Sequence, residues 1–488
     1  MKQQQFLNLA SADEAEERFW QAVQPVPLGE ELIPIEHARE RILSRNVIAK
    51  HNVPYFDRSN FDGFAVRAED TFDAQETAPV SLKLNPEVLA CGVVPEKSVT
   101  QGTATTIATG GVMPRGADAV VMIENTLPIE SDKSGEAGIK ILKAVVPSGG
   151  VSLAGSDIGA GEVVLRIGDL LGYRETGTLA ALGEAKVWVW RRPKVGIIST
   201  GDELVAPGGQ MELGKVFDSN ATVLGHAVEE LGCEPVHFGI VPDEESSIET
   251  VLQEGLELDF VLISGGTSKG EGDLNYRVFE KYNNPGILVH GVALKPGKPL
   301  CLAILAGTPA AILPGFPTSA TFTFSKFIAP VLRAMAGRLP EPTTHVKANV
   351  PVRLNSDKGR TEFNLVHLVR NDSGFSAYST GKGSGSITGF ARADGFMEIP
   401  RNTEMVEVDE EVRIQLLGKS AQPPDLMIIG SHCVGLDYLI GEMQKRGVSC
   451  KFLAVGSMGG VFAAQRGECD LAGIHLMDEN AGEYNRHL

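Results

Sequence analysis

The chain has 488 residues, of which 43% are hydrophobic and 22% are charged, with a formal net charge of −18 at pH 7. A chain longer than the ~250–300 residues at which single cores stop growing is expected to form several domains, and its acidic balance excludes a non-specific nucleic-acid binder. The sequence contains neither the ~18 consecutive apolar residues of a membrane span nor a secretory leader, so we expect a cytoplasmic protein that does not bind membranes.

The first predicted element is a helix that begins after Ser11. Glu14 completes a capping box with Ser11, and Phe19 and Val23 keep helical spacing. Short β-rich runs broken by Gly and Pro then predict a separate β module over 53–161. Helical patterning returns near 169–183, which indicates that the module is inserted into a helical domain built from 1–52 and 162–192.

Strands and helices alternate from 193 to 337, a pattern typical of a parallel sheet covered on both faces. Ligands of such folds bind beyond the carboxyl ends of the strands, so the loops after Ile198 and Ile263 are the expected site. Alternating segments over 338–418 predict a small all-β domain. A linker at 422–425 and a strand–helix–strand pattern over 424–488 follow.

Carboxylates and glycines occupy the two loops. Asp202 and Glu203 follow a predicted strand, where they either hold Mg²⁺ or only cap a turn and face solvent. The segment SGGTS at 264–268 offers backbone N–H groups and hydroxyls, which together form an anion nest. Asp273, just after it, either caps a helix or helps to hold the metal.

Two further motifs favour anion binding. Lys295 and Lys298 lie on a turn stiffened by prolines, which is either an oxyanion site or a solvated basic turn. The segment PGFPTS at 314–319 ends a strand and begins a helix, whose N-terminal N–H groups favour an anion.

In their order along the chain, these motifs resemble the molybdopterin molybdenumtransferase family, called MoeA in bacteria and represented in animals by the second catalytic domain of gephyrin. The resemblance covers about residues 8–418. The matching segments are PYFDRSNFDGFAVR, IATGGVMPRGADAVVMIE, AGSDIGAGEVV, STGDEL, ISGGTSKGEGD, LKPGKP and LPGFPTSA.

The resemblance implies a multidomain α/β fold in an elongated homodimer, with the active site between protomers. Its domains would be a discontinuous helical domain (1–52 and 162–192), an inserted β-rich domain (53–161), a parallel-sheet α/β domain of the molybdopterin-binding fold (193–337) and a β-barrel-like domain (338–418). Residues 424–488 resemble the opening of a periplasmic-binding-protein-like domain, which would here be partial.

The resemblance also implies a reaction: molybdate is inserted into adenylylated molybdopterin with Mg²⁺, and AMP is released. Glu203, Asp243 and Asp273 would hold the metal, and Lys295 and Lys298 would bind molybdate or the developing oxyanion. Asp62, Thr109 and Asp157 of the inserted module would reach the site of the partner protomer, Asp62 as a catalytic residue. The substrate-binding residues would be Thr109, Asp157, Thr200, Gly201, Asp202, Ser264, Gly265, Gly266, Thr267, Ser268, Pro314, Gly315, Pro317, Arg360 and Ser386.

The sequence departs from the family pattern at three motifs. DRSNFDGFA replaces DNSAMDGYA, SGGTS replaces SGGVS, and PGFP replaces PGNP, so that Phe316 supplies no side-chain donor. Three alternatives stay open: a homologue that prefers tungstate, a non-catalytic scaffold or sensor for molybdate or pterin, and the preceding pterin adenylyltransferase. Transient contacts with that adenylyltransferase and with enzymes that accept the cofactor are expected.

Overall fold

A computed structural model describes residues 9–129, 137–265, 274–372, 374–381, 385–417, 423–478 and 482–485. The chain divides into two compact units, one formed by Gly29–Arg191 and the other by Met1–Leu28 together with Arg192–Leu488. All six cysteines are free thiols. Within the described ranges, no helix combines the length and the apolar character needed to cross a membrane.

The unit Gly29–Arg191 begins and ends in paired strands. β1 (Glu30–Pro34) pairs antiparallel with β12 (Lys186–Trp190), and β2 (Val47–Ile48) pairs antiparallel with β11 (Val163–Leu165). The predicted helix near 169–183 is α2 (Tyr173–Ala181). Its Leu179 packs with residues of the paired strands in a small core.

Between these pairs lies a six-stranded sheet with the order β7-β4-β6-β5-β9-β8. Its inward side chains, such as Val66, Leu82 and Ile139, form a core of their own. This sheet and the short β3–β10 pair account for the predicted β-rich module. The bounds are β3 (Arg58–Ser59), β4 (Gly63–Val66), β5 (Val80–Leu89), β6 (Thr103–Ile107), β7 (Ala119–Met122), β8 (Thr126–Ile129), β9 (Gly138–Ile141) and β10 (Val151–Ser152).

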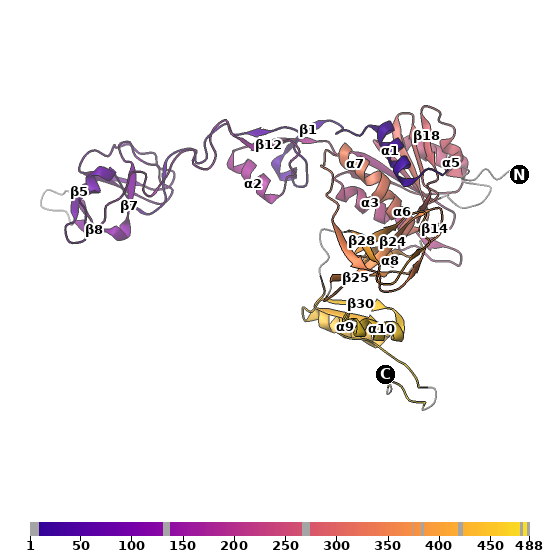
Figure 1. The fold of residues 1–488 in the computed structure, drawn as a ribbon. Coiled ribbons are helices and arrows are strands. Elements are labelled where there is room, and N and C mark those ends of the chain that lie inside the picture. The colour runs from indigo at the N-terminus through magenta and orange to yellow at the C-terminus, as the bar shows by residue number, and fades with distance from the viewer. Residues whose placement is uncertain are drawn as a thin grey trace. The chain divides into compact units, whose positions relative to one another are not determined.

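The second unit contains a six-stranded sheet with the order β16-β13-β17-β21-β20-β18 (Figure 1). The first four strands are parallel, but β20 runs antiparallel to both of its neighbours, β21 and β18, so the predicted parallel sheet is mixed at this edge. The cause is a two-residue turn between β20 and β21, in which Ala306 and Gly307 both have positive φ, as type I′ hairpins require. The bounds are β13 (Lys194–Thr200), β16 (Glu234–Val241), β17 (Phe260–Gly265), β18 (Gly286–His290), β20 (Cys301–Leu305) and β21 (Thr308–Leu313).

Helices cover both faces of this sheet because consecutive strand residues point to opposite sides. Ile197 packs with α1, α3, α6 and α7, whereas its neighbour Ile198 packs with α4 and α5. The predicted capping box of Ser11 and Glu14 is present at the start of α1. The bounds are α1 (Ala12–Val23), α3 (Asn220–Glu230), α4 (Glu245–Gly255), α5 (Leu274–Phe279), α6 (Pro317–Thr323), a π-helical turn (Phe324–Ile328) and α7 (Ala329–Met335).

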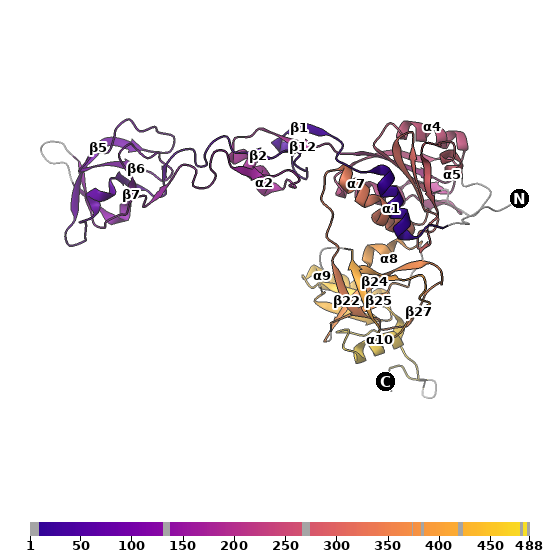
Figure 2. The same cartoon turned by 45° about the horizontal axis from the view of Figure 1, so that its top comes forward.

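Five strands after α7 close into a barrel, because β24 pairs with both β25 and β26. This confirms the predicted β-barrel-like domain (Figure 2). β19 (Leu294–Lys295) of the α/β domain adds to β24, which ties the two domains together. The bounds are β22 (His345–Asn349), β24 (Thr361–Asn371), β25 (Gly374–Ser379), α8 (Ile387–Arg392), β26 (Gly395–Ile399) and β28 (Glu411–Leu416).

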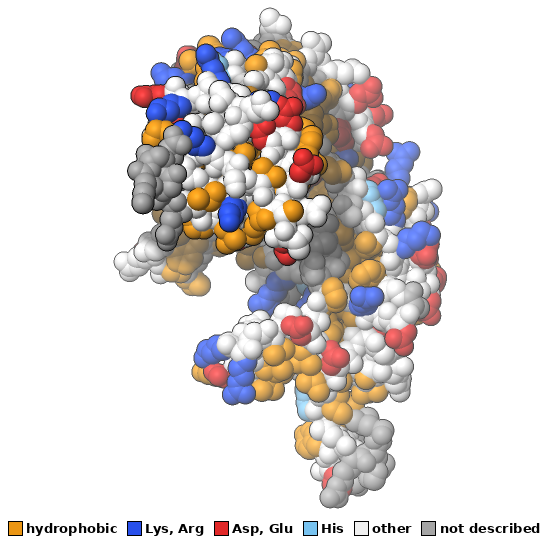
Figure 3. Space-filling model, turned by 90° about the vertical axis from the view of Figure 1, so that its left-hand side faces the viewer, with side chains coloured by type: hydrophobic (Ala, Val, Ile, Leu, Met, Phe, Trp, Pro, Cys, Tyr) orange, Lys and Arg blue, Asp and Glu red, His pale blue; other side chains and the backbone are white. Residues whose placement is uncertain are grey.

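The last segment folds against the barrel. Parallel strands β29 (Leu426–Gly430) and β30 (Cys450–Ala454) are joined by α9 (Val434–Lys445) and followed by α10 (Gly456–Gln465). Ile429 and Leu453 share a core with Val369 and Tyr378 of the barrel. Acidic and basic side chains are interspersed on the face drawn in Figure 3, so the net charge of −18 is not gathered into one patch there.

Candidate active site

Two buried asparagines hold together the ends of β13 and β17 and the turn that follows β21. Asn220, at the start of α3, donates from Nδ2 to Ser264 Oγ at 2.8 Å and to the Gly315 carbonyl at 2.9 Å. Asn275 in α5 donates from Nδ2 to Thr200 Oγ1 at 2.8 Å and to the Gly265 carbonyl at 3.2 Å. Two strand ends and one turn that carry predicted site residues therefore meet at one edge of the sheet, connected by side chains that the sequence did not single out.

The backbone at the end of β17 requires glycine. Gly265 has φ +119°, and a Cβ on it would lie 2.0 Å from the Thr200 carbonyl oxygen. An L-residue would therefore be strained and would also clash with backbone. This close approach brings the ends of β13 and β17 side by side, where an anion can contact both.

Three carboxylates gather beside these loops. The backbone N–H of Asp243 donates to Asp202 Oδ1 at 3.2 Å. Burial raises the pKa of Asp243, and the negative charges of Asp202 and Glu203 raise it further. A cation placed here would relieve that repulsion, and Mg²⁺ takes one or two protein carboxylates together with phosphate oxygens.

Not every predicted residue of this edge can be placed. Gly266, Thr267, Ser268 and Asp273 lie outside the described residues. Among the residues that the structure describes, no group of three His, Cys, Asp or Glu side chains is arranged as a complete metal site. The carboxylates present suit a Mg²⁺ ion that draws its remaining ligands from substrate and water, as Mg²⁺ usually does.

Lys295 lies in β19, where the α/β domain meets the barrel. Its Nζ is 3.3 Å from both Asp357 Oδ2 and Glu362 Oε2, and Glu362 also accepts a bond from Ser356 Oγ at 2.9 Å. Burial lowers the pKa of Lys295, but the carboxylates of Glu362 and Asp357 outweigh it, so the pKa is raised and the ammonium is kept charged. Lys298 follows three residues later and is partly buried.

The start of α6 meets the barrel at Ser386. Thr318 Oγ1 donates to the Ser386 carbonyl at 2.5 Å, and the Ser386 hydroxyl caps α8 by accepting from the Gly389 N–H at 3.1 Å. Phe316, which replaces the family's asparagine, is 63% exposed. The flanking Pro314, Gly315 and Pro317 belong to the same turn, and Arg360 immediately precedes β24.

The other unit contains the three remaining predicted residues. Asp62 Oδ1 accepts from the N–H of Thr109 at 2.7 Å and from its Oγ1 at 3.0 Å. These two bonds lower the pKa of Asp62 and hold its carboxylate in one orientation. Asp157 is exposed, and its N–H donates to the Val53 carbonyl at 3.1 Å.

Comparison with protein families defines the class. Models described as the MoeA N-terminal region (domain I and II), a probable molybdopterin binding domain and the MoeA C-terminal region (domain IV) match residues 10–183, 196–334 and 347–417. A model of the PBP superfamily domain matches residues 440–488. Together with the mixed sheet and its loop site, these matches define a multidomain protein built around a molybdopterin-binding α/β domain.

Similarity to individual proteins identifies the family. The chain is 32% identical over 390 residues to molybdopterin molybdenumtransferase 2 of Mycobacterium tuberculosis, covering 79% of this chain and 94% of that one. It is 33% identical over 392 residues to the molybdopterin molybdenumtransferase of Nostoc, covering 79% and 88%. A crystal structure titled as molybdopterin biosynthesis MoeA protein from Pyrococcus horikoshii superposes with a TM-score of 0.72 at 35% identity, over 85% of this chain and 100% of that one. The chain belongs to the MoeA family of molybdopterin molybdenumtransferases.

Proposed function

We propose that this protein is a transferase of molybdenum cofactor biosynthesis that inserts molybdate into adenylylated molybdopterin in a Mg²⁺-dependent reaction that releases AMP. Its relatives of known name are molybdopterin molybdenumtransferases. The observation that carries the proposal is the edge where Asn220 and Asn275 join the ends of β13 and β17 and the turn after β21, next to Asp202, Glu203 and Asp243. Such an edge supplies backbone donors for phosphate and carboxylates for a cation.

The carboxylates would bind Mg²⁺ through Glu203 and Asp243, with Asp273 as a third proposed ligand. Mg²⁺ supplies charge neutralisation at phosphate oxygens when it is bound. Asp202 keeps Asp243 in place by accepting the backbone bond at 3.2 Å. The loop residues Thr200, Gly201 and 264–268 would contact the phosphates from the other side.

Lys295 and Lys298 would bind the oxyanion. An ammonium has three donors, and two carboxylates at 3.3 Å hold the Lys295 ammonium in one position while keeping it charged. An ammonium oriented in advance needs little reorganisation when negative charge develops next to it. Positioning and electrostatics would therefore promote the reaction without a covalent nucleophile.

The inserted module would complete the site of a second copy in a homodimer. Asp62, whose carboxylate is fixed by two bonds from Thr109, would be its catalytic contribution, and Thr109 and Asp157 would contact substrate. Arg360, Ser386 and the turn formed by Pro314, Gly315 and Pro317 would line the pocket from the barrel and α6. We place the reaction in the cytoplasm, where transient contacts with the adenylyltransferase and with cofactor-accepting enzymes would pass the pterin on.

The test is AMP release from adenylylated molybdopterin by purified protein with Mg²⁺ and molybdate. Glu203→Gln removes one metal ligand's charge and is expected to lower release at least 100-fold, the scale of losing one preorganised electrostatic contact. Glu230→Gln, an exposed position at the end of α3, is the matched control and should release AMP at the wild-type rate. Equal release by the folded Glu203→Gln variant would remove the metal assignment. Tight ligand binding without release by the wild type would instead support a sensor or scaffold.

A further inference from the structure

The proposed site residues follow one another in a fixed order along one edge of the α/β sheet. The sheet order is β16-β13-β17-β21-β20-β18, and the carboxylates follow β16 and β13, Gly265 ends β17, and Phe316 follows β21. Lys295 comes next, in the connection between β18 and β20, which leaves the same edge because β20 begins opposite the end of β21. The lysine turn also contacts α6, where a Cβ on Gly297 would lie only 2.4 Å from Thr323 Cγ2. Phe316 therefore comes between the edge proposed for phosphate and the turn proposed for the oxyanion.

Close contacts on both sides fix the position of Phe316. The preceding residue, Gly315, accepts a hydrogen bond from Asn220 at 2.9 Å, and a Cβ on Gly315 would lie 3.8 Å from the Cα of Gly265. On the barrel side, a Cβ on Gly385 would lie 3.6 Å from Cδ1 of the Phe316 ring. The ring is thus held between the end of β17 and the barrel.

The fold itself gains little from a phenylalanine at this position. Phe316 is the N-cap residue of α6, where the family's asparagine would supply a side-chain acceptor for backbone N–H groups and a phenylalanine supplies none. Its ring is 63% exposed, so most of the free energy available from burying an aromatic side chain is not realised. What the ring does offer is a flat apolar surface on which another planar ring can stack.

We propose that Phe316 stacks on the pterin of the substrate and thereby orients it, an inference that rests on the proposed function. The pterin of molybdopterin carries both the phosphate and the dithiolene that receives molybdenum. A substrate with its phosphates at Gly265 and its oxyanion at Lys295 holds its pterin between these points, where Phe316 lies. The adenine, joined through the phosphates, would lie on the side of the carboxylates.

The first test is equilibrium binding of molybdopterin to the full chain in the absence of oxygen, followed by the fluorescence of the pterin. Phe316→Asn restores the family's residue and is expected to weaken binding about tenfold, the scale of one aromatic stacking contact. Phe316→Tyr keeps the ring and should bind within about twofold of the wild type. Phe462→Asn makes the same exchange at another exposed phenylalanine, in α10, and should leave binding unchanged.

Denaturant unfolding separates contact with the substrate from a structural role. Because asparagine is the better N-cap residue, the Phe316→Asn protein should be at least as stable as the wild type while it binds molybdopterin less tightly. A variant that loses stability together with binding would show that Phe316 supports the turn, and would overturn the proposal.

Molybdopterin binding and AMP release are measured separately, so failure of this inference can be told from failure of the proposed function. The inference is overturned if the wild type does not bind molybdopterin, or if the Phe316→Asn protein binds it as tightly as the wild type. It is also overturned if that variant loses affinity for AMP, measured by calorimetric titration, and keeps its affinity for molybdopterin. AMP release by the wild type alongside any of these results leaves the proposed function standing. Binding that depends on Phe316 without AMP release would support the inference and contradict the proposed function.

Discussion

At the scale of single residues, buried amides determine the shape of the proposed active site. Asn275 is fully buried, and its Nδ2 donates to both Thr200 and Gly265, so one side chain fixes the distance between the ends of two strands. Asn220 does the same for Ser264 and Gly315. The site geometry therefore depends on residues that need not contact substrate.

Asn275→Ala removes both bonds and leaves the Thr200 hydroxyl buried without that donor. We expect the free energy of unfolding to fall by about 2–3 kcal/mol, since unsatisfied buried groups and a new cavity both cost stability. Denaturant unfolding measures this, with the exposed Asn283→Ala as control. AMP release should fall as well, under conditions where the variant is still folded. A change below about 0.5 kcal/mol would show that the loops do not depend on Asn275.

The partly buried ring of His367 predicts how the stability of the fold depends on pH. Because the pKa of His367 in the folded protein, about 4, lies below the ordinary histidine pKa of 6.5, the unfolded chain binds a proton that the folded chain excludes between these pH values. The contribution of His367 to stability is therefore present above about pH 6.5 and is lost as pH falls toward 4. Nuclear magnetic resonance of histidine-labelled protein, assigned with His367→Gln, should show this ring titrating near pH 4. Titration near 6.5 would contradict the burial of the ring.

At the scale of elements, the periodicity of the sequence predicted where helices and strands occur better than it predicted which strands pair. The capping box of α1 and the alternation of strands and helices from 193 to 337 were visible in the sequence, since both are local patterns. The antiparallel pairing of β20 with β21 was not visible in the sequence. It depends on positive φ at Ala306 and Gly307, and an alanine does not indicate such a turn. Barrel closure, through the pairing of β24 with β26, joins segments distant in the sequence and followed only from the family resemblance.

The candidate site was also predictable only in part from the sequence. Motif spacing placed Asp202 and Glu203 in the loop after a strand, because strand ends can be located from hydrophobic runs, but Ser264, predicted to follow a strand, lies within β17. The partners of Lys295 come from the barrel, at Asp357 and Glu362, and a pairing between domains leaves no local pattern. Asn220 and Asn275 were missed for a related reason: a buried amide in a helix has the same sequence signature as a solvated one.

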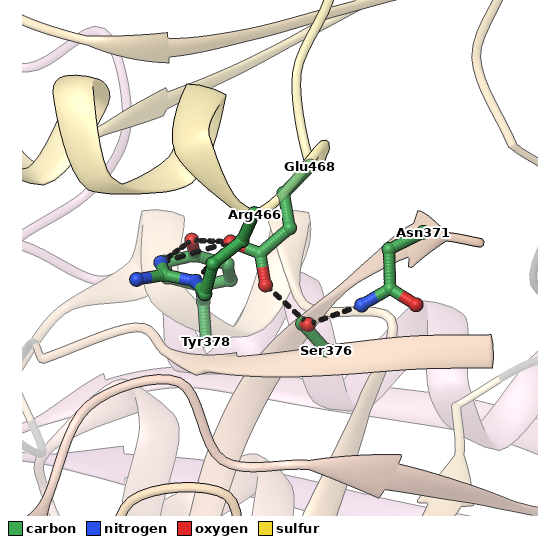
Figure 4. A network of polar contacts seen from close by, with 5 residues as sticks. All are labelled: Asn371, Ser376, Tyr378, Arg466 and Glu468. Atoms are coloured by element: carbon green, nitrogen blue, oxygen red, sulfur yellow. Dashed lines mark hydrogen bonds and ion pairs between the residues drawn. The ribbon is translucent and has the colours of Figure 1, made fainter. Parts of the chain in front are cut away.

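The docking of the C-terminal segment also belongs to this scale. Arg466→Met removes the cation that donates to both Glu468 and Tyr378, while the hydroxyls of Ser376 and Tyr378 remain (Figure 4). Local stability of the segment should fall by about 2 kcal/mol, the scale of a hydrogen bond to a charged group. Hydrogen exchange of the β29 amides should then be about 30-fold faster. Arg446→Met, on the exposed end of α9, should leave exchange unchanged. Unchanged exchange in Arg466→Met would contradict the anchoring role.

At the scale of the whole molecule, the proposed residues are divided between the two compact units. Asp62, Thr109 and Asp157 lie in Gly29–Arg191, whereas the carboxylate edge and both lysines lie in the other unit. In the proposed homodimer, each active site would draw one set from each protomer.

The central claim is that this chain inserts molybdenum into a pterin. The most direct measurement is the molybdenum content of the pterin product, determined by mass spectrometry after incubation of the protein with adenylylated molybdopterin, Mg²⁺ and molybdate. The account predicts about one molybdenum per AMP released, with both quantities lost together in Glu203→Gln. AMP release without molybdenum in the product, or molybdenum incorporation at the same rate without the protein, would contradict it.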